Sequence, residues 1–209
     1  MLLFFDIETA PACDWETLES RLKEIWIERY LKDNDEAPED FYLERAWLYS
    51  AFSRILCISC WYIWEDWEIV VKTYQWEEKE IIESFFEATQ KVRLCWWNIK
   101  KFDIPFIFNR AIVNGIRIPQ YISSIGKKPW EVSHLDLMEI WKNNWFTNTW
   151  LALTCEVLWI PTPKDAMNWA EVGKHYLETW DVSKIVEYCE KDVKATIAVY
   201  QKMLECVII

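Results

Sequence analysis

Apolar and polar positions follow two different periods along the chain, and together they predict a mixture of strands and helices. Short apolar or alternating runs predict strands at 2–6, 54–62, 68–74, 92–95 and 132–135. Apolar residues that recur every three or four positions predict helices at 77–91, 104–113, 136–142, 151–158, 170–176 and 182–206. The second and third strands are expected to form a hairpin, because only a short polar segment separates them.

Residues 12–50 are rich in charge and are expected to be helical, with a loop at 33–40 around Pro38. They form a helical insertion between the first and second strands. Hairpin strands followed by strands that alternate with helices are typical of a mixed sheet flanked by helices. No repeat, low-complexity stretch or linker divides the 209 residues. The pattern therefore predicts one α/β domain spanning 1–209.

The net charge is −11, which argues against a protein that coats nucleic acid through bulk positive charge. An enzyme that meets phosphates through bound cations, by contrast, must gather carboxylates. Seven cysteines in apolar surroundings predict reduced thiols and a cytoplasmic protein. Cys57 and Cys60 form a CxxC, but a strand directs them to opposite faces, which disfavours zinc. No apolar run approaches the ~18 residues of a membrane helix, and the N-terminus lacks the basic start of a signal peptide.

Two residue types depart from ordinary composition. The chain has 16 Trp and 3 Gly, whereas about 15 Gly would be usual for this length. Several tryptophans stand in turns, loops or helix ends where glycine is typical: Trp64, Trp67, Trp145, Trp159, Trp169 and Trp180. Our hypothesis is that many tryptophans replace glycines encoded by UGA, which some bacterial codes read as glycine. The alternative is a tryptophan-rich protein that uses its aromatic rings for stacking. UGG codons at Trp64, Trp67, Trp96 and Trp159 would refute the hypothesis.

Acidic side chains stand at three points where predicted elements begin or end. In FFDIETAP, Asp6 and Glu8 are two residues apart, so a strand places both carboxylates on one face. In NIKKFDIPFIF, Asp103 directly precedes an apolar helical run. In YCEKDVKAT, Tyr188 and Asp192 share a helix face. Each motif alone has an ordinary explanation: a solvent-facing strand end, a helix N-cap, and a packed or solvated helix pair.

Together and in this order, the three motifs resemble those of the DnaQ-like, or DEDD, superfamily of 3′–5′ exonucleases. That superfamily has a DxE on its first strand, an Nx(4)D entering a helix and a YxxxD on its last helix. Its histidine branch needs His where Glu187 stands, so the resemblance is to the tyrosine branch. Further segments, namely RILCIS, HLDLM and WIPTPKDAMNW, resemble the predicted exonucleases related to the proofreading domain of family-B DNA polymerases. The resemblance spans nearly the whole chain, with tryptophan for family glycine at Trp96, Trp159 and Trp169.

The resemblance implies a ribonuclease H-like mixed β-sheet flanked by α-helices, and a single 3′–5′ exonuclease-like domain. It implies two Mg²⁺ ions, for which Mn²⁺ can substitute. The metal ligands would be Asp6, Glu8, Asp103 and Asp192, and these four with Tyr188 would be the catalytic residues. Tyr188 would orient the attacking water and share its proton. The residues expected to contact the substrate are Ile7, Thr9, Asn98 and Phe102, with Asn98 near the scissile phosphate and the others beside the terminal bases.

The sequence thus predicts a metal-dependent enzyme that hydrolyses the 3′ end of single-stranded nucleic acid, with DNA favoured and a role in DNA repair. One alternative is an RNA-trimming exoribonuclease. Another is a nucleic-acid-binding or polymerase-accessory module that keeps the fold but no longer cuts, because Trp96 beside the second motif could crowd the cleft. Any polymerase would be a separate chain. No Walker loop, GxGxxG or GxSxG motif is present, which disfavours an unrelated α/β enzyme.

Overall fold

The computed structural model describes residues 1–32, 35–63, 69–123, 125–128, 131–143, 146–161 and 169–206. Its strands are β1 (Leu2–Pro11), β2 (Ser53–Ile63), β3 (Ile69–Gln75), β4 (Arg93–Trp96) and β5 (Leu135–Asp136). Its α-helices are α1 (Ser20–Trp26), α2 (Pro38–Arg45), α3 (Glu78–Ala88), α4 (Asp103–Val113), α5 (Leu137–Lys142), α6 (Leu151–Val157), α7 (Trp169–Thr179) and α8 (Ser183–Leu204). A π-helical turn (Ile27–Leu31) continues α1, and a 3₁₀ turn (Ala46–Leu48) follows α2.

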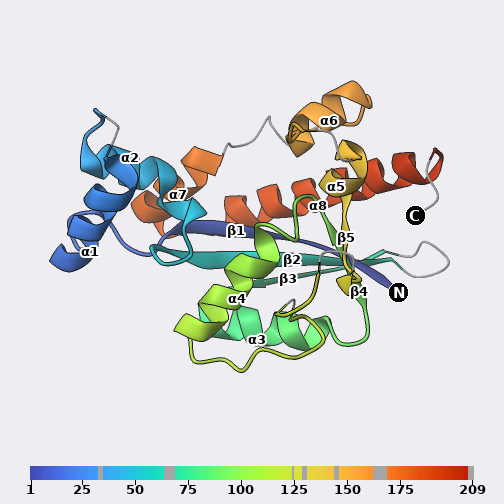
Figure 1. The fold of residues 1–209 in the computed structure, drawn as a ribbon, viewed down its shortest axis with the longest axis horizontal. Coiled ribbons are helices and arrows are strands. Elements are labelled where there is room, and N and C mark those ends of the chain that lie inside the picture. Colours follow the sequence, from blue (N-terminus) through green and yellow to red (C-terminus); the bar gives the residue numbers. More distant parts are fainter. Residues whose placement is uncertain are drawn as a thin grey trace.

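The strands form one mixed sheet in the order β3-β2-β1-β4-β5, so β1 is the central strand. β1, β2 and β3 pair antiparallel, whereas β4 and β5 run parallel to β1. The predicted hairpin is therefore present as β2 and β3; its turn, with Trp64 and Trp67, lies outside the described residues. The α/β class with a mixed sheet and flanking helices is confirmed (Figure 1).

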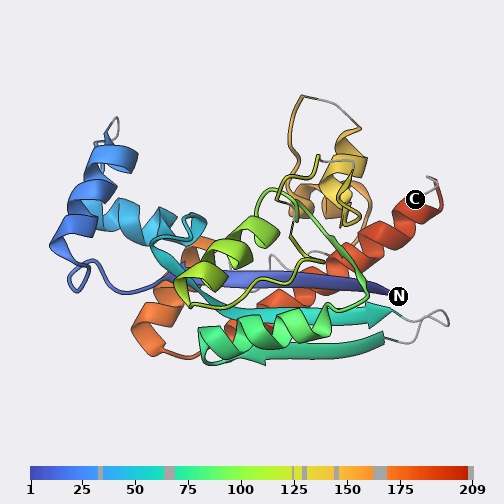
Figure 2. The ribbon, with the colours of Figure 1, turned by 60° about the horizontal axis from the view of Figure 1, so that its bottom comes forward.

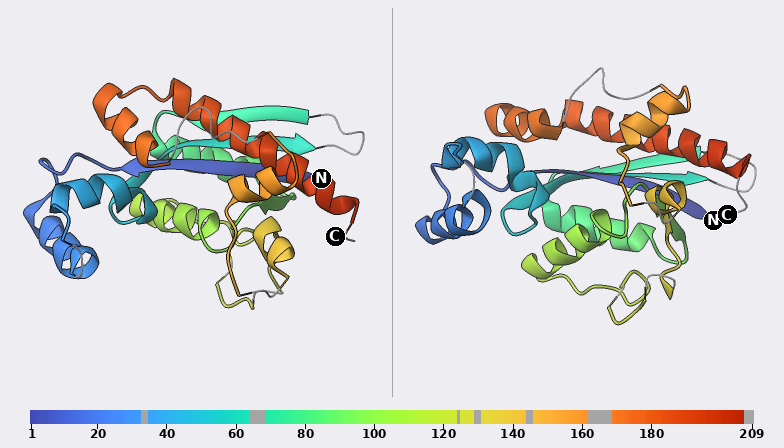
Figure 3. Two further views of the ribbon diagram at one scale, coloured as in Figure 1. Left: turned by 90° about the horizontal axis from the view of Figure 1, so that it is seen from above. Right: turned by 45° about the horizontal axis from the view of Figure 1, so that its top comes forward.

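Helices cover both faces of the sheet. Alternation along β1 sends Phe4 to one face, where its ring packs edge-on against Tyr200 of α8 at 5.2 Å. Phe5 points to the opposite face and contacts Phe85 of α3 at 4.7 Å. α8 accordingly lies on one side of the sheet, with α3 and α4 on the other (Figures 1 and 3). The main core fills both layers.

β1 is paired unevenly along its two edges, and this creates the space for a site. β2 pairs with β1 over Leu2–Pro11. Among the described residues, β4 pairs with β1 only as far as Phe4, and β4 itself ends at Trp96. The expected first strand, 2–6, was therefore too short: pairing with β2 carries the strand past its polar residues. In the part of the chain that the structure describes, no strand pairs with this edge in the second half of β1.

The insertion between β1 and β2 has a hydrophobic cluster of its own, made by Leu18, Trp26, Tyr42, Ala46 and Phe52. The helices of the insertion, α1 and α2, stand at one end of the sheet, while α5 and α6 lie at the other end (Figure 2). The expected loop around Pro38 was wrong in its second half. Pro38 is the first residue of α2, because its fixed φ suits a first helical turn, where no N–H bond is needed.

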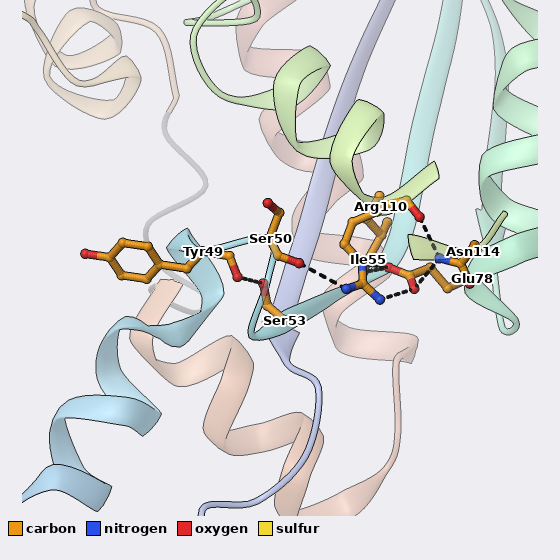
Figure 4. Close-up of polar contacts among 7 residues, drawn as sticks. All are labelled: Tyr49, Ser50, Ser53, Ile55, Glu78, Arg110 and Asn114. Atoms are coloured by element: carbon orange, nitrogen blue, oxygen red, sulfur yellow. Dashed lines mark hydrogen bonds and ion pairs between the residues drawn. The ribbon is translucent and has the colours of Figure 1, made fainter. Parts of the chain in front are cut away.

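A buried ion pair connects α3 and α4, the two helices on the face opposite α8, to the start of β2 (Figure 4). Arg110 of α4 donates to Glu78 of α3 through Nη2 at 2.6 Å and through Nε at 2.8 Å. Its Nη1 donates to the carbonyl oxygen of Ser50 at 3.0 Å, and Glu78 also accepts from the amide of Ile55 and from Asn114. Each charge is thus paired and hydrogen-bonded, as a buried ion requires.

Three tryptophans adopt the left-handed backbone that favours glycine. The φ angles are +98° at Trp76, +59° at Trp159 and +55° at Trp180, a rare conformation for a bulky residue. After α6, the amides of Trp159 and Ile160 bond back to the carbonyls of Glu156 and Cys155, which is the Schellman pattern. This geometry supports glycine at Trp159 and Trp180, while the codon origin stays a hypothesis.

Trp96 differs from these three, because it lies in β4, is buried, and has no positive φ. Residue 145 and the side chain of Trp169 lie outside the described residues, so the expectations for them stay predictions. Cys57 and Cys60 are buried in two different clusters and are unpaired. Among the described residues, none of the helices has both the length and the apolar character needed to cross a membrane.

Candidate active site

Asp6 and Glu8 lie on the face of β1 that α8 covers, since they follow Phe4 at two-residue steps. Both side chains are buried, with exposed fractions of 7% and 4%. The pairing with β2 shifts register between Glu8 and Thr9, which marks a bulge directly after the acidic pair. Such bulges redirect side chains and occur next to active sites. The ordinary explanation of this motif, a solvent-facing strand end, does not hold.

Tyr188 and Asp192 lie four residues apart on the buried side of α8. Between them, the Cys189 thiol donates to the carbonyl oxygen of Asp6 at 3.5 Å and fixes α8 against β1. Tyr188 packs in the cluster that joins α7 and α8, while its hydroxyl is close enough to Asp192 for hydrogen bonding to lower the pKa of that carboxyl. The helix thus brings one carboxylate and one phenol to the acidic pair.

Asp103 is the first residue of α4 and is 2% exposed. The N-cap position belongs to Phe102, so Asp103 does not have the capping role that its context also suggested. The preceding turn is closed by the amides of Lys101 and Phe102, which both donate to the carbonyl oxygen of Asn98 at 3.1 Å. This turn sets where α4 begins and therefore where its first carboxylate lies.

The three motifs meet in one cavity of about 320 Å³ beside the open edge of β1. The four predicted carboxylates all line it, although they come from β1, α4 and α8. The predicted substrate-contacting residues also line the cavity: Ile7, Thr9, Asn98 and Phe102. Tyr188 does not line the cavity. The fold thus brings together residues that are far apart in the sequence, while the roles of these residues stay predictions.

Several cavity residues were missed by the sequence reasoning. Trp47 and Leu48, in the 3₁₀ turn of the insertion, form one wall, and the Trp47 ring packs edge-on to Phe102 at 6.2 Å. Thr9 donates to the carbonyl oxygen of Trp47 at 2.9 Å and holds this wall to β1. The opposite wall is residues 148–151, to which Trp97 donates through its indole N–H at 3.0 Å. Neither wall carries a periodic pattern that could have revealed it.

The cavity concentrates negative charge in a buried place. Burial raises the pKa of Asp6, and the charges of Glu8, Asp192 and Asp103 raise it further. Burial likewise raises the pKa of Glu8 and Asp103 well above their ordinary range. Burial also raises the pKa of Asp192 to about 7, against a hydrogen bond with Tyr188 that lowers it. Like charges this close favour protonation unless a cation lies between them.

The donor set suits a hard divalent cation. Carboxylate oxygens are the ligands that Mg²⁺ prefers, and four of them share this cavity. Ligand atoms of Asp6, Glu8 and Cys189 lie within 4.8 Å of one another. Burial raises the pKa of Cys189, so its thiol stays protonated and is not a ligand for such an ion. The oxygen donors fit Mg²⁺ or Mn²⁺ and leave no cysteine–histidine set for zinc here.

Comparison with known proteins gives a family and a fold. The profile described as "Predicted 3'-5' exonuclease related to the exonuclease domain of PolB" matches residues 45–207. No curated protein sequence matches the chain. Among solved structures, the family B DNA polymerase of the hyperthermophilic archaeon Pyrobaculum calidifontis is similar over 97% of this chain, with a TM-score of 0.58 and 16% identity. The chain spans 24% of that polymerase chain. This likeness supports a ribonuclease H-like fold.

Proposed function

The chain belongs to the family of predicted 3′–5′ exonucleases related to the exonuclease domain of PolB, and from this premise we propose that it removes nucleotides from the 3′ end of single-stranded DNA. The observation that carries the proposal is the convergence of Asp6, Glu8, Asp103 and Asp192 on one buried cavity. Such a cluster is costly without cations and suits phosphodiester hydrolysis with them.

The four carboxylates would hold two Mg²⁺ ions, with Mn²⁺ as a substitute. When bound, these ions supply an activated water and neutralise charge on the leaving oxygen. Tyr188, which does not line the cavity, would help to orient the attacking water through its hydrogen bond with Asp192. Burial and the charges of Asp192, Glu8 and Asp6 raise the pKa of Tyr188, so the phenol keeps its proton at neutral pH and acts through a hydrogen bond rather than as a phenolate.

The walls of the cavity suit a nucleobase. Trp47, Trp97, Trp150 and Phe102 give flat aromatic surfaces around the carboxylates. Bases stack on such surfaces without regard to sequence, and Asn98 would contact the phosphate between the stacked base and the carboxylates. The relation to a polymerase exonuclease domain favours DNA and a role in DNA repair, with any polymerase as a separate chain. The seven free cysteines accord with a reducing cytoplasm.

End-labelled single strands of DNA and RNA test the proposal directly. With Mg²⁺ or Mn²⁺, a 5′-labelled DNA strand should shorten stepwise, and a 3′-labelled strand should release a labelled mononucleotide at once. EDTA should stop both reactions. Asp192→Asn should stop them as well, whereas Glu187→Gln should not, because Glu187 is exposed on the same helix and pairs with Lys191.

Each alternative gives a different result. Cleavage of RNA but not DNA would identify an RNA-trimming exoribonuclease. Strand binding without cleavage would identify an inactive accessory module. Cleavage that persists in EDTA would refute the metal-dependent mechanism.

A further inference from the structure

Asp136 lies in the HLDLM segment but outside the three motifs that supply the cavity's carboxylates. It is buried, and backbone amides from two separate segments bond to it. It ends β5, is 2% exposed, and pairs in register with Trp96 of β4. Its Oδ1 accepts from the amides of Met138 at 3.1 Å and Glu139 at 3.3 Å. The same Oδ1 accepts from the amide of Asn98 at 3.0 Å, and Oδ2 accepts from the amide of Lys100 at 3.2 Å.

The first two bonds are an ordinary N-cap, since they satisfy the first turn of α5. The other two bonds have no part in α5, because they reach 38 and 36 residues back to the turn between β4 and α4. In that turn, Asn98 holds the left-handed conformation, with φ +64°. The amides of Lys101 and Phe102 donate to its carbonyl oxygen, and α4 then begins at Asp103. The turn carries both Asn98 and Asp103 to the cavity.

We propose that Asp136 is a positioning residue for the candidate active site: its carboxylate clamps the turn from Asn98 to Lys100 and thereby sets where Asn98 and Asp103 face the cavity. The proposal rests on the proposed function. Asp136 does not line the cavity, so its effect on the position of Asn98 and Asp103 passes through the turn. Its second oxygen is the part that a simple cap does not need, because a Ser hydroxyl caps a helix equally well.

Two substitutions separate clamping from capping. Asp136→Ser keeps a capping oxygen for Met138 and Glu139 but is too short to reach the turn. Asp136→Asn keeps the side-chain shape and one acceptor oxygen, and it turns a donor toward Lys100. The matched control is Asn114→Ala at the far end of α4, which removes a hydrogen bond of 2.9 Å to Glu78 without touching the turn.

Backbone amide exchange measured by NMR is the readout that does not depend on activity. In Asp136→Ser, the amides of Asn98 and Lys100 should exchange faster, while those of Met138 and Glu139 keep their protection. In Asp136→Asn, only the amide of Lys100 should exchange faster. Unchanged exchange at Asn98 and Lys100 in both variants would overturn the proposal.

Cleavage kinetics provide the second readout. Asp136→Ser should lower kcat by about 10- to 100-fold and raise the Mg²⁺ concentration needed for half-maximal rate, as expected when support for a metal site is lost. Asp136→Asn should fall between this variant and the parent, and Asn114→Ala should change stability but not the Mg²⁺ requirement. Parental kcat and Mg²⁺ requirement in Asp136→Ser would overturn the proposal. A parent protein that does not cleave would refute the proposed function instead, and amide exchange would still test the clamp.

Discussion

Trp159→Gly should stabilise the protein, although it removes the largest side chain. Trp159 follows α6 in the left-handed conformation, and its side chain is 95% exposed. Loss of the indole therefore uncovers little apolar surface. The chain contains its own reference, because α4 ends in the same Schellman pattern with Gly115 at φ +67°. The first residue after the helix cap is thus glycine at the end of α4 and tryptophan at the end of α6.

The size of the effect follows from two opposing terms. A left-handed conformation costs roughly 1–2 kcal/mol for a residue with a Cβ, and glycine avoids this cost. Glycine loses more backbone entropy on folding, which costs roughly 0.5–1 kcal/mol. The net gain at Trp159 is therefore about 0.5–1 kcal/mol, or about 1–4 °C in Tm for a domain of this size. The reverse change, Gly115→Ala, should cost a similar amount without a steric clash, since an added Cβ would meet nothing within 4 Å.

Denaturant unfolding of the glycine and alanine variants at two positions isolates the backbone effect. Trp159→Ala removes the ring but keeps a Cβ. The difference between Trp159→Gly and Trp159→Ala therefore reports the two backbone terms alone, which are the cost of positive φ for a residue with a Cβ and the entropy cost of glycine. At Trp141, inside α5, the same comparison should have the opposite sign, because glycine is less favourable than alanine in a helix by about 1 kcal/mol. If Trp159→Gly is no more stable than Trp159→Ala, the left-handed backbone does not explain this position, and tryptophan belongs there.

Three further predictions concern the cavity. Asp6→Ala and Asp192→Ala should each abolish cleavage and leave stability in EDTA unchanged or higher, because one of four repelling carboxylates is gone; full activity in either variant would show that the cluster is not catalytic. In EDTA, the parent should lose stability as pH rises from about 4 to 7, because unfolding then releases the proton that Asp192 keeps when folded, with its pKa raised from 3.8 to about 7. Asp192→Asn should flatten this slope, and a parental slope in that variant would contradict the assignment. Trp96→Gly should raise turnover by widening the cavity but lower the free energy of unfolding by about 3 kcal/mol, since its indole is buried; unchanged turnover would show that the indole does not restrict access.

Sequence patterns could predict those parts of the site that depend on local geometry. Asp6 and Glu8 share a strand face, and Tyr188 and Asp192 share a helix face, because spacing alone fixes these relations. The length of β1 could not be predicted in the same way. Its polar residues interrupt the apolar pattern at Asp6, yet the backbone goes on pairing with β2 to Pro11. Burial there serves both the cavity and the core, since Ile7 and Ala10 belong to hydrophobic clusters.

The parts that escaped prediction depend on contacts between distant segments. Trp47 reaches the cavity because the insertion folds back and Thr9 holds its carbonyl oxygen. Asp136 binds backbone amides, which every residue possesses, so no side-chain pattern marks its partners. The strand expected at 132–135 is only Leu135–Asp136 in the structure. Backbone bonds to Asp136 hold this segment in place, and a run of apolar residues does not.

The separate cluster of the insertion has a consequence for how this protein can open. Leu18, Trp26, Tyr42, Ala46 and Phe52 pack among themselves and apart from the sheet's core, so residues 18–52 form a candidate cooperative unit with its own free energy of local unfolding. The 3₁₀ turn that carries Trp47 belongs to this unit, whereas the four carboxylates lie on β1, α4 and α8. A sub-global fluctuation of this unit would have to break the hydrogen bonds from Thr9, Asn109 and Arg110 to it. It would then remove one wall of the cavity and leave the acidic floor intact. Opening of the insertion would then expose one side of the cavity. The free energy of that opening would depend on the aromatic packing inside the insertion, away from the four carboxylates.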